Sequence, residues 1–213
     1  MSGFDAKNIA VQKTARYHHR ACSEETRAQW MIAHGYGMLT TYFARKFESL
    51  PNTNELLVPE GLHRFYVQGT EGRVGASWMT KEERENDIRD YIQYLNKLYS
   101  KHRKEAPLIA FGFSQGVATI CRWAAQLTHK PAHLILWAGV IPPDMDPYAW
   151  ENVYANVPIT IFVGTHDPYR TDAHNTLYQH IKSVRKHVDI VEFDGAHAVD
   201  AQVLTEWYKR QRF

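Results

Sequence analysis

Short apolar runs alternate along the chain with stretches in which apolar residues recur at helical spacing. The runs are typical of buried strands, and the stretches between them are typical of amphipathic helices. Strands joined by helical crossovers predict an α/β fold, with a mainly parallel sheet that carries helices on both faces. The expected strands are 9–19, 29–33, 56–59, 108–113, 133–137, 159–163 and 188–193, and the expected helices are 38–47, 80–99, 115–127, 175–184 and 198–210.

Two segments depart from this alternation. Residues 9–19 place apolar side chains at every second position from Ile9 and Val11 onward, which predicts a strand with one solvated face, joined antiparallel to the sheet. Residues 61–79 contain four glycines and no clean period, so we expect a long functional or mobile loop there. The following Thr-Lys-Glu-Glu at 80–83 has the pattern of a helix capping box.

Length and composition narrow the class of protein. A chain of 213 residues predicts one domain, 1–213, with no length left for a lid domain. The 25 Lys and Arg against 23 Asp and Glu argue against nucleic acid as a partner. No apolar stretch approaches the length of about 18 residues that membrane insertion needs, and the N-terminus has no apolar signal segment. Cys121, in an apolar helical stretch, fits a reduced packing thiol, so we expect a cytoplasmic protein.

The main chemical motif is Gly112-Phe113-Ser114-Gln115-Gly116, which fits G-x-S-x-G. It lies between an expected strand and an expected helix, which is the context that a nucleophilic serine of this motif requires. Glycines on both sides permit strand and helix backbones to approach closely. The alternative is a glycine-rich turn with an incidental serine, but the flanking elements favour Ser114 as a nucleophile.

A serine nucleophile needs a histidine base, and the base needs an acid that fixes its tautomer. Reactive groups in an open parallel sheet collect where strands end. His197 follows strand 188–193 and Asp167 follows strand 159–163, so we predict these two as partners of Ser114. His166 is the main competitor for the base. The resulting chain order of Ser, Asp and His is that of the α/β-hydrolases.

Catalysis at an acyl carbon also needs N–H donors for the oxyanion. The N–H of Gln115 follows the nucleophile, and the glycine-containing turn at 34–37 offers a second donor, for which we choose Tyr36. For the substrate, we expect an apolar cleft lined by Trp78, Met79, Val140 and Ile141. The alternative for Trp78 is that it only covers the core.

At these motifs the chain resembles the α/β-hydrolase serine esterases of the phospholipase/carboxylesterase family, of the acyl-protein thioesterase type. The matching pieces are H-G-x-G at 34–37, G-F-S-Q-G at 112–116, G-x-x-D-P at 164–168 and the Gly-Ala-His at 195–197. The resemblance spans residues 28–210. It implies the same triad and oxyanion donors, and catalysis without a metal or an organic cofactor.

The expected function is that of a serine hydrolase that cleaves a small-molecule carboxylic ester or thioester through an acyl-enzyme. Two alternatives use the same fold: acyl transfer to an alcohol, which needs the same triad, and a non-catalytic ligand-binding protein. The sequence leaves open the acyl group, the leaving group and the oligomeric state.

Overall fold

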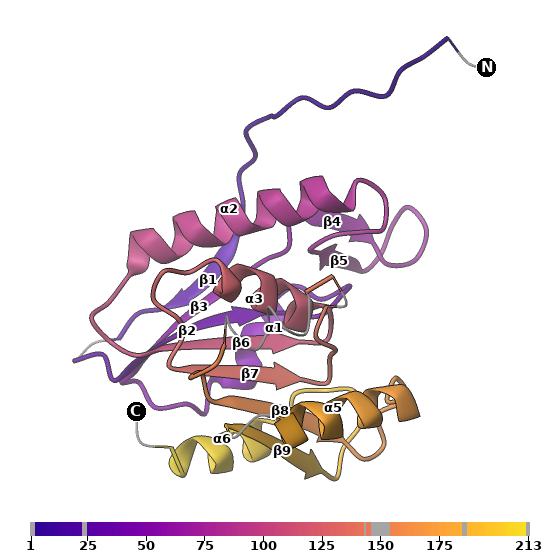
Figure 1. Cartoon of the computed structure of the whole chain (residues 1–213). Coiled ribbons are helices and arrows are strands. Elements are labelled where there is room, and N and C mark those ends of the chain that lie inside the picture. Colours follow the sequence, from indigo (N-terminus) through magenta and orange to yellow (C-terminus); the bar gives the residue numbers. More distant parts are fainter. Residues whose placement is uncertain (1–2, 23–24, 143, 146–153, 185–186, 212–213) are drawn as a thin grey trace.

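The computed structural model of the protein describes residues 3–22, 25–142, 144–145, 154–184 and 187–211. Within this part, the main sheet has seven strands in the order β1-β3-β2-β6-β7-β8-β9 (Figure 1). All neighbouring strands run parallel except β1, which is antiparallel to β3. The strands are β1 (Tyr17–Arg20), β2 (Ala28–Ala33), β3 (Asn54–Pro59), β6 (Leu108–Phe113), β7 (His133–Trp137), β8 (Ile159–Gly164) and β9 (Val188–Phe193).

Helices cover both faces of this sheet. Alternate residues of β2 point to opposite sides, so that Met31 packs in one apolar cluster and Trp30 in the other. The Met31 side is covered by α2 (Arg84–His102), α3 (Gln115–Ala125) and α5 (Asp172–Val184). The Trp30 side is covered by α1 (Thr40–Phe43), the 3-10 helix η1 (Ala44–Phe47) and α6 (Ala201–Lys209). The predicted α/β fold, with a mainly parallel sheet and an antiparallel N-terminal strand, is confirmed.

The prediction of a strand over residues 9–19 is wrong in extent. Strand β1 begins only at Tyr17, and the segment before it extends away from the sheet (Figure 1). Ile9 and Val11 are 87% and 80% exposed. The physical reason is the lack of a partner: Tyr17 pairs with Pro59, the last residue of β3, and no strand lies beyond it within the described residues.

The expected loop at 61–79 contains a second, two-stranded sheet, formed by β4 (His63–Tyr66) and β5 (Val74–Ser77). Each strand has only four residues, so neither produces a clear period in the sequence. The predicted capping box is also wrong. Thr80 bonds to Glu82 within a turn, and α2 begins later, after Glu83 with its left-handed φ of 50°.

Other helix boundaries depend on local caps and packing. The stretch 38–47 divides into α1 and η1, and the last helix starts at Ala201 rather than 198. The Asp200 carboxylate caps this last helix by accepting hydrogen bonds from the N–H groups of Gln202 and Val203. None of the helices in the described ranges is long and apolar enough to cross a bilayer.

Candidate active site

Ser114 lies in a tight turn between β6 and α3. Its backbone has φ 53° and ψ −118°, a conformation that costs free energy for a residue with a side chain. The Ser114 N–H donates to Trp137 O at 2.9 Å, and Ser114 O accepts from the Val117 N–H at 3.0 Å. These hydrogen bonds, together with the adjoining strand and helix, hold the serine in the strained turn.

The two glycines of the motif have the predicted steric role. A Cβ atom at Gly112 would lie 2.4 Å from the Gly116 carbonyl oxygen, and one at Gly116 would lie 2.2 Å from the Ala33 carbonyl oxygen. Both contacts are with backbone, which has little freedom to shift. Strand and helix can therefore approach each other here only because both positions lack side chains.

The structure brings Ser114, His197 and Asp167 together at the ends of β6, β9 and β8. The Ser114 Oγ lies 3.0 Å from His197 Nε2, and His197 Nδ1 lies 2.8 Å from Asp167 Oδ2. The other carboxylate oxygen of Asp167 accepts a hydrogen bond from the Tyr169 N–H at 2.8 Å. The Asp167 side chain is only 4% exposed, so the carboxylate is fixed on both oxygens in a largely dry site.

His166, the competing candidate for the base, faces elsewhere. Its Nδ1 pairs with Asp194 Oδ1 at 3.1 Å, on the surface, where the two side chains are 73% and 90% exposed. In space, Ser114 is hydrogen-bonded to His197, and His197 is hydrogen-bonded to Asp167. His166 takes no part in these two hydrogen bonds.

The turn at 34–37 is held beside Ser114 by a buried histidine. His34 Nε2 accepts from the Gly61 N–H at 2.9 Å, and its Nδ1–H donates to Gly35 O at 2.7 Å. Burial lowers the pKa of His34 to about 4, so the ring is neutral at pH 7 and suits this pair of bonds. A Cβ atom at Gly35 would lie 3.2 Å from the Ser114 Cβ, which shows how closely the turn approaches the serine.

The two predicted oxyanion donors flank the same cavity as Ser114. Tyr36 and Gln115 both line it, and no hydrogen bond from either backbone N–H is found within the described residues. Both N–H groups are therefore without a backbone acceptor in this part of the chain. Their arrangement, one beside the nucleophile and one on a neighbouring turn, has the form of an oxyanion hole.

Trp78 and Met79 do not line the cavity, contrary to the prediction. Trp78 is fully buried, and its Nε1–H donates to His34 O at 2.8 Å. The Gln115 side chain holds this segment: its Oε1 accepts from the Trp78 N–H at 3.1 Å, and its Nε2 donates to Met79 O at 2.8 Å. Trp78 therefore braces the turn at 34–37 from within the core, which was the alternative for this residue.

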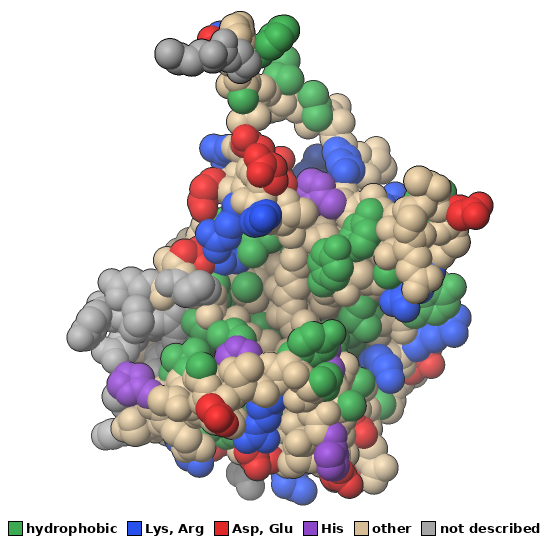
Figure 2. Space-filling view, turned by 90° about the vertical axis from the view of Figure 1, so that its right-hand side faces the viewer, with side chains coloured by type: hydrophobic (Ala, Val, Ile, Leu, Met, Phe, Trp, Pro, Cys, Tyr) green, Lys and Arg blue, Asp and Glu red, His purple; other side chains and the backbone are tan. Residues whose placement is uncertain are grey.

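The cavity beside Ser114 has a volume of about 500 Å³. Figure 2 views the molecule from the end at which the parallel strands of Figure 1 point, and shows a hollow there with hydrophobic side chains gathered around it. Of the predicted substrate contacts, Val140 lines the cavity, whereas Ile141 is buried in the core next to it. The wall is thus mainly apolar on the Val140 side, as in many small-molecule sites.

Comparison with known proteins identifies the class. Residues 25–204 match the family model described as Serine hydrolase (FSH1). The chain belongs to this family. No curated protein sequence is similar enough to this chain to count as a match. The expected serine-hydrolase class is therefore confirmed at the level of the family.

Solved structures with the same fold include esterases. Acyl-protein thioesterase 2 of Zea mays is 17% identical, with a TM-score of 0.69 over 92% of this chain and 98% of its own. A Mesorhizobium loti carboxylesterase is 14% identical, with a TM-score of 0.67 over 92% and 95%. A Bacillus cereus carboxylesterase is 13% identical, with a TM-score of 0.63 over 92% and 94%. At these identities the likeness shows the α/β-hydrolase fold, which the sequence motifs had predicted.

Sequence reasoning missed part of the cavity wall. Tyr169 and Arg170 lie two and three residues after Asp167, in the same loop after β8, so their place near a strand end was a usable signal. His174 and Tyr178 come from α5, and nothing in their spacing indicates which way that helix turns them. Burial, and secondarily the charge of Asp167, raises the pKa of Tyr178 to about 12, so its hydroxyl stays protonated and donates to Gly139 O at 3.0 Å.

A buried carboxylate anchors the chain that follows the turn at 34–37. Glu60 accepts hydrogen bonds from Arg16 Nη2 at 2.7 Å, from Arg64 Nε at 2.7 Å, and from the N–H and hydroxyl of Thr40 at 3.2 and 3.0 Å. Burial by itself would raise the pKa of Glu60, but these donors outweigh it and lower the pKa to about 2. One charge thus joins the N-terminal segment, β4 and the start of α1.

Replacing Glu60 by glutamine should lower the free energy of unfolding at pH 7 by about 3 kcal/mol, because two arginines lose their buried partner. Since the folded pKa lies below the ordinary value of 4.5, ionised Glu60 stabilises the fold fully above that pH. The contribution is lost as the pH falls from about 4.5 to 2. Urea unfolding from pH 7 to pH 3 should therefore show a shallower acid loss for Glu60→Gln than for the wild type.

The matched control is Glu71→Gln, which makes the same change at an exposed glutamate. It should unfold as the wild type does at every pH. Parallel stability curves for the wild type and Glu60→Gln would contradict the assigned role of this carboxylate.

Proposed function

We propose that the protein hydrolyses small-molecule carboxylic esters or thioesters through an acyl-enzyme formed on Ser114. The observation that carries the proposal is the hydrogen-bonded chain from Ser114 Oγ to His197 and from His197 to Asp167, at 3.0 and 2.8 Å. Membership of a serine hydrolase family and a fold shared with known esterases support it.

In the first half of the reaction, Ser114 Oγ attacks the acyl carbon while its proton passes to His197 Nε2. Asp167 keeps the Nδ1–H of His197 in place and stabilises the imidazolium that forms. The N–H groups of Tyr36 and Gln115 bind the oxyanion of the tetrahedral intermediate. When the intermediate collapses, His197 returns the proton to the leaving alcohol or thiol, and the acyl group stays on Ser114.

The second half repeats these roles with water. His197 Nε2 accepts a proton from water as the water oxygen attacks the acyl-enzyme, and the same two N–H groups bind the second oxyanion. Collapse releases the carboxylic acid and returns the proton to Ser114. No step in this sequence requires a group outside the chain other than water.

The cavity favours a neutral acyl chain. Val140, Ala138 and Val163 give it apolar wall beside Ser114. Arg170, the cationic side chain of this wall, is paired with Glu192 and bonded to Asn175, so its charge is already compensated. We therefore propose short and medium acyl groups as the substrate class, with the chain lying against Val140.

A panel of aryl esters and acyl thioesters of graded chain length tests this proposal. We expect kcat/KM to rise by at most about fourfold per added methylene while apolar wall is available, and then to level or fall. The variant Val140→Phe fills the cavity, so its optimum should shift to shorter chains while acetate esters are still hydrolysed.

The control for this panel is Val67→Phe, which makes the same change at an exposed valine outside the cavity. Its profile should match that of the wild type. An unchanged chain-length profile in Val140→Phe would contradict the assignment of the acyl site. If the wild type hydrolyses none of the aryl esters and none of the acyl thioesters, the proposed function itself is contradicted.

We also propose a cytoplasmic location. No disulfide is found in the described part of the chain, and Cys121 is a buried thiol in the apolar face of α3. Burial raises its pKa well above the ordinary value, which makes it a packing residue rather than a reactive one. A thiol used in this way suits a reducing compartment.

A further inference from the structure

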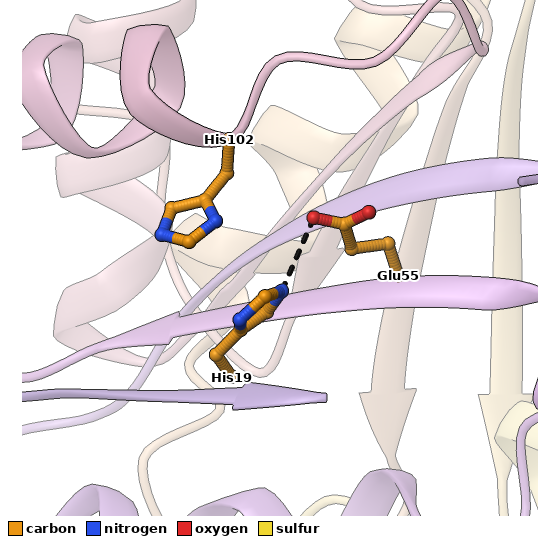
Figure 3. Close-up of side chains that lie close together, drawn as sticks. All are labelled: His19, Glu55 and His102. Atoms are coloured by element: carbon orange, nitrogen blue, oxygen red, sulfur yellow. Dashed lines mark hydrogen bonds and ion pairs between the residues drawn. The ribbon is translucent and has the colours of Figure 1, made fainter. Parts of the chain in front are cut away.

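Two histidines and a glutamate from three separate elements meet at the far end of the sheet from Ser114. His19 comes from β1, Glu55 from β3 and His102 from the end of α2 (Figure 3). Glu55 lies opposite Gln29 of β2, which in turn lies opposite Leu108, the first residue of β6. Since Ser114 follows the last residue of β6, the cluster and the candidate active site occupy opposite ends of the strands.

The three side chains converge because of strand register. His19 pairs with Leu57, so its side chain lies on the same face of the sheet as Leu57 and Glu55, two residues apart on β3. Leu57 packs in the cluster that α2 covers, and the last residue of α2 is His102. The fold therefore brings all three to one side of the sheet.

The donor atoms are close enough to share one ion. His19 Nε2 lies 3.1 Å from Glu55 Oε1, and one donor atom from each of the three residues can be chosen so that all lie within 4.8 Å of one another. Tetrahedral zinc with bonds of about 2.0 to 2.2 Å places its ligand atoms roughly 3.3 to 3.6 Å apart. From separations of at most 4.8 Å, the donor atoms would have to approach one another by no more than about 1.5 Å to reach that spacing.

His102 is oriented by a partner outside the cluster. Its Nε2 is hydrogen-bonded to the Tyr17 hydroxyl at 3.0 Å, and the other ring nitrogen is turned toward Glu55 and His19 (Figure 3). The Gln29 side chain donates to His102 O at 2.5 Å, which holds the end of α2 in place. A second hydrogen bond that fixes the ring of a ligating histidine is a regular feature of protein metal sites.

We propose that His19, Glu55 and His102 form a binding site for a divalent transition metal of the Zn²⁺ type, with water as the remaining ligand. Two imidazoles and one carboxylate are a donor set that suits zinc and its neighbours better than Ca²⁺ or Mg²⁺. The Glu55 carboxylate is buried, whereas the His19 side chain is 27% exposed, which gives an ion access from solvent.

Lys104 is the cation that the metal would replace. Its Nζ lies 3.6 Å from Glu55 Oε2, and its side chain is 49% exposed, so it can turn into solvent. A bound ion would link β1, the antiparallel strand at the edge of the sheet, to β3 and α2. The site would thus stabilise the attachment of the N-terminal strand, independently of the chemistry at Ser114.

The test is a Zn²⁺ titration of chelator-treated, full-length protein in competition with a chromogenic chelator, together with thermal unfolding. We expect one Zn²⁺ per chain and a rise in Tm of about 5 °C at an excess of about 100-fold over Kd. Ca²⁺ and Mg²⁺ should leave Tm unchanged. Co²⁺ should give the intense visible absorption of a four-coordinate site.

The variants His19→Ala, Glu55→Gln and His102→Ala should each weaken Zn²⁺ binding by about 100-fold or more, and Tyr17→Phe by about 10-fold. Each variant is first compared with the wild type by circular dichroism without metal. His19→Ala is the most informative of these, because its partly exposed side chain can be removed with the least disturbance of the core.

Two controls locate the ion. His63→Ala removes a surface histidine that pairs with Asp87 at 3.0 Å and that belongs to no three-residue group of possible ligands in the described part of the chain, so this variant should bind Zn²⁺ as the wild type does. His197→Ala removes the histidine of the candidate active site and should also keep the binding. Absence of Zn²⁺ binding, affinity unchanged in His19→Ala and His102→Ala, or loss of binding in His197→Ala instead would overturn the proposal and leave an ion pair between His19 and Glu55.

Discussion

Replacing Ser114 by alanine is expected to lower kcat by about 10⁴- to 10⁶-fold, because members of a triad act as a unit and the nucleophile has no substitute. Alanine keeps the Cβ atom and loses only the hydroxyl. The strain of the turn and the packing around it therefore stay the same, so Tm should change little. The measurement is kcat on an aryl ester that the wild type hydrolyses, together with Tm for both proteins.

The matched control is Ser183→Ala, which removes an exposed serine hydroxyl from α5 and should leave kcat unchanged. More than a tenth of wild-type kcat in Ser114→Ala would mean that another group carries the reaction. A large fall in Tm would instead show that the hydroxyl has a structural role that its hydrogen bond to His197 does not explain.

The second large effect is expected at the histidine. His197→Ala should lower kcat over the same range as Ser114→Ala, since the ring is the group within 3.0 Å of the serine hydroxyl. His166→Ala should leave kcat within about twofold of wild type, because an exposed pair with Asp194 contributes little. Both variants replace a histidine by alanine, at positions 31 residues apart. In one the lost ring contacts Ser114, and in the other it contacts Asp194.

Comparing the two histidine variants shows which histidine acts as the base. His166 precedes the predicted acid directly and also follows a strand, so the sequence alone left it in competition. Equal losses in the two variants, or a larger loss in His166→Ala, would contradict the assignment of the base.

The parts of the molecule that could be predicted from the sequence are those set by local pattern and by general topology. The β6–Ser114–α3 unit follows from an apolar run, two glycines and a helical stretch, which all lie within one short window. Asp167 and His197 follow from the rule that parallel strands end at the same edge of a sheet. Neither inference required knowledge of a distant contact.

The parts that were wrong depend on partners that the sequence does not display. Residues such as Ile9 alternate as in a strand, but a strand needs a neighbour, and β3 ends opposite Tyr17. Trp78 is apolar and near the active-site loops, which fits either a cleft wall or the core. The hydrogen bond from its indole to His34 O, which places it in the core, joins residues 44 positions apart.

Part of the cavity wall could not be predicted from the sequence either. Tyr178 reaches the site from the middle of α5, and the direction of its side chain is set by the rotation of that helix on the sheet. A helical period in the sequence indicates which residues share a face, but not which of them point at the neighbouring strand end. Val140, by contrast, lies in the turn three residues after the end of β7 and was predicted from that position.

The most direct test of the central proposal is the mass of the protein after reaction with an organophosphonate, which forms a stable adduct with an activated serine. We expect one adduct per chain, located by peptide mapping at Ser114. It should be absent in Ser114→Ala and strongly slowed in His197→Ala, and it should form at the wild-type rate in His166→Ala. An unmodified wild-type protein, or an adduct that persists in Ser114→Ala, would contradict the account.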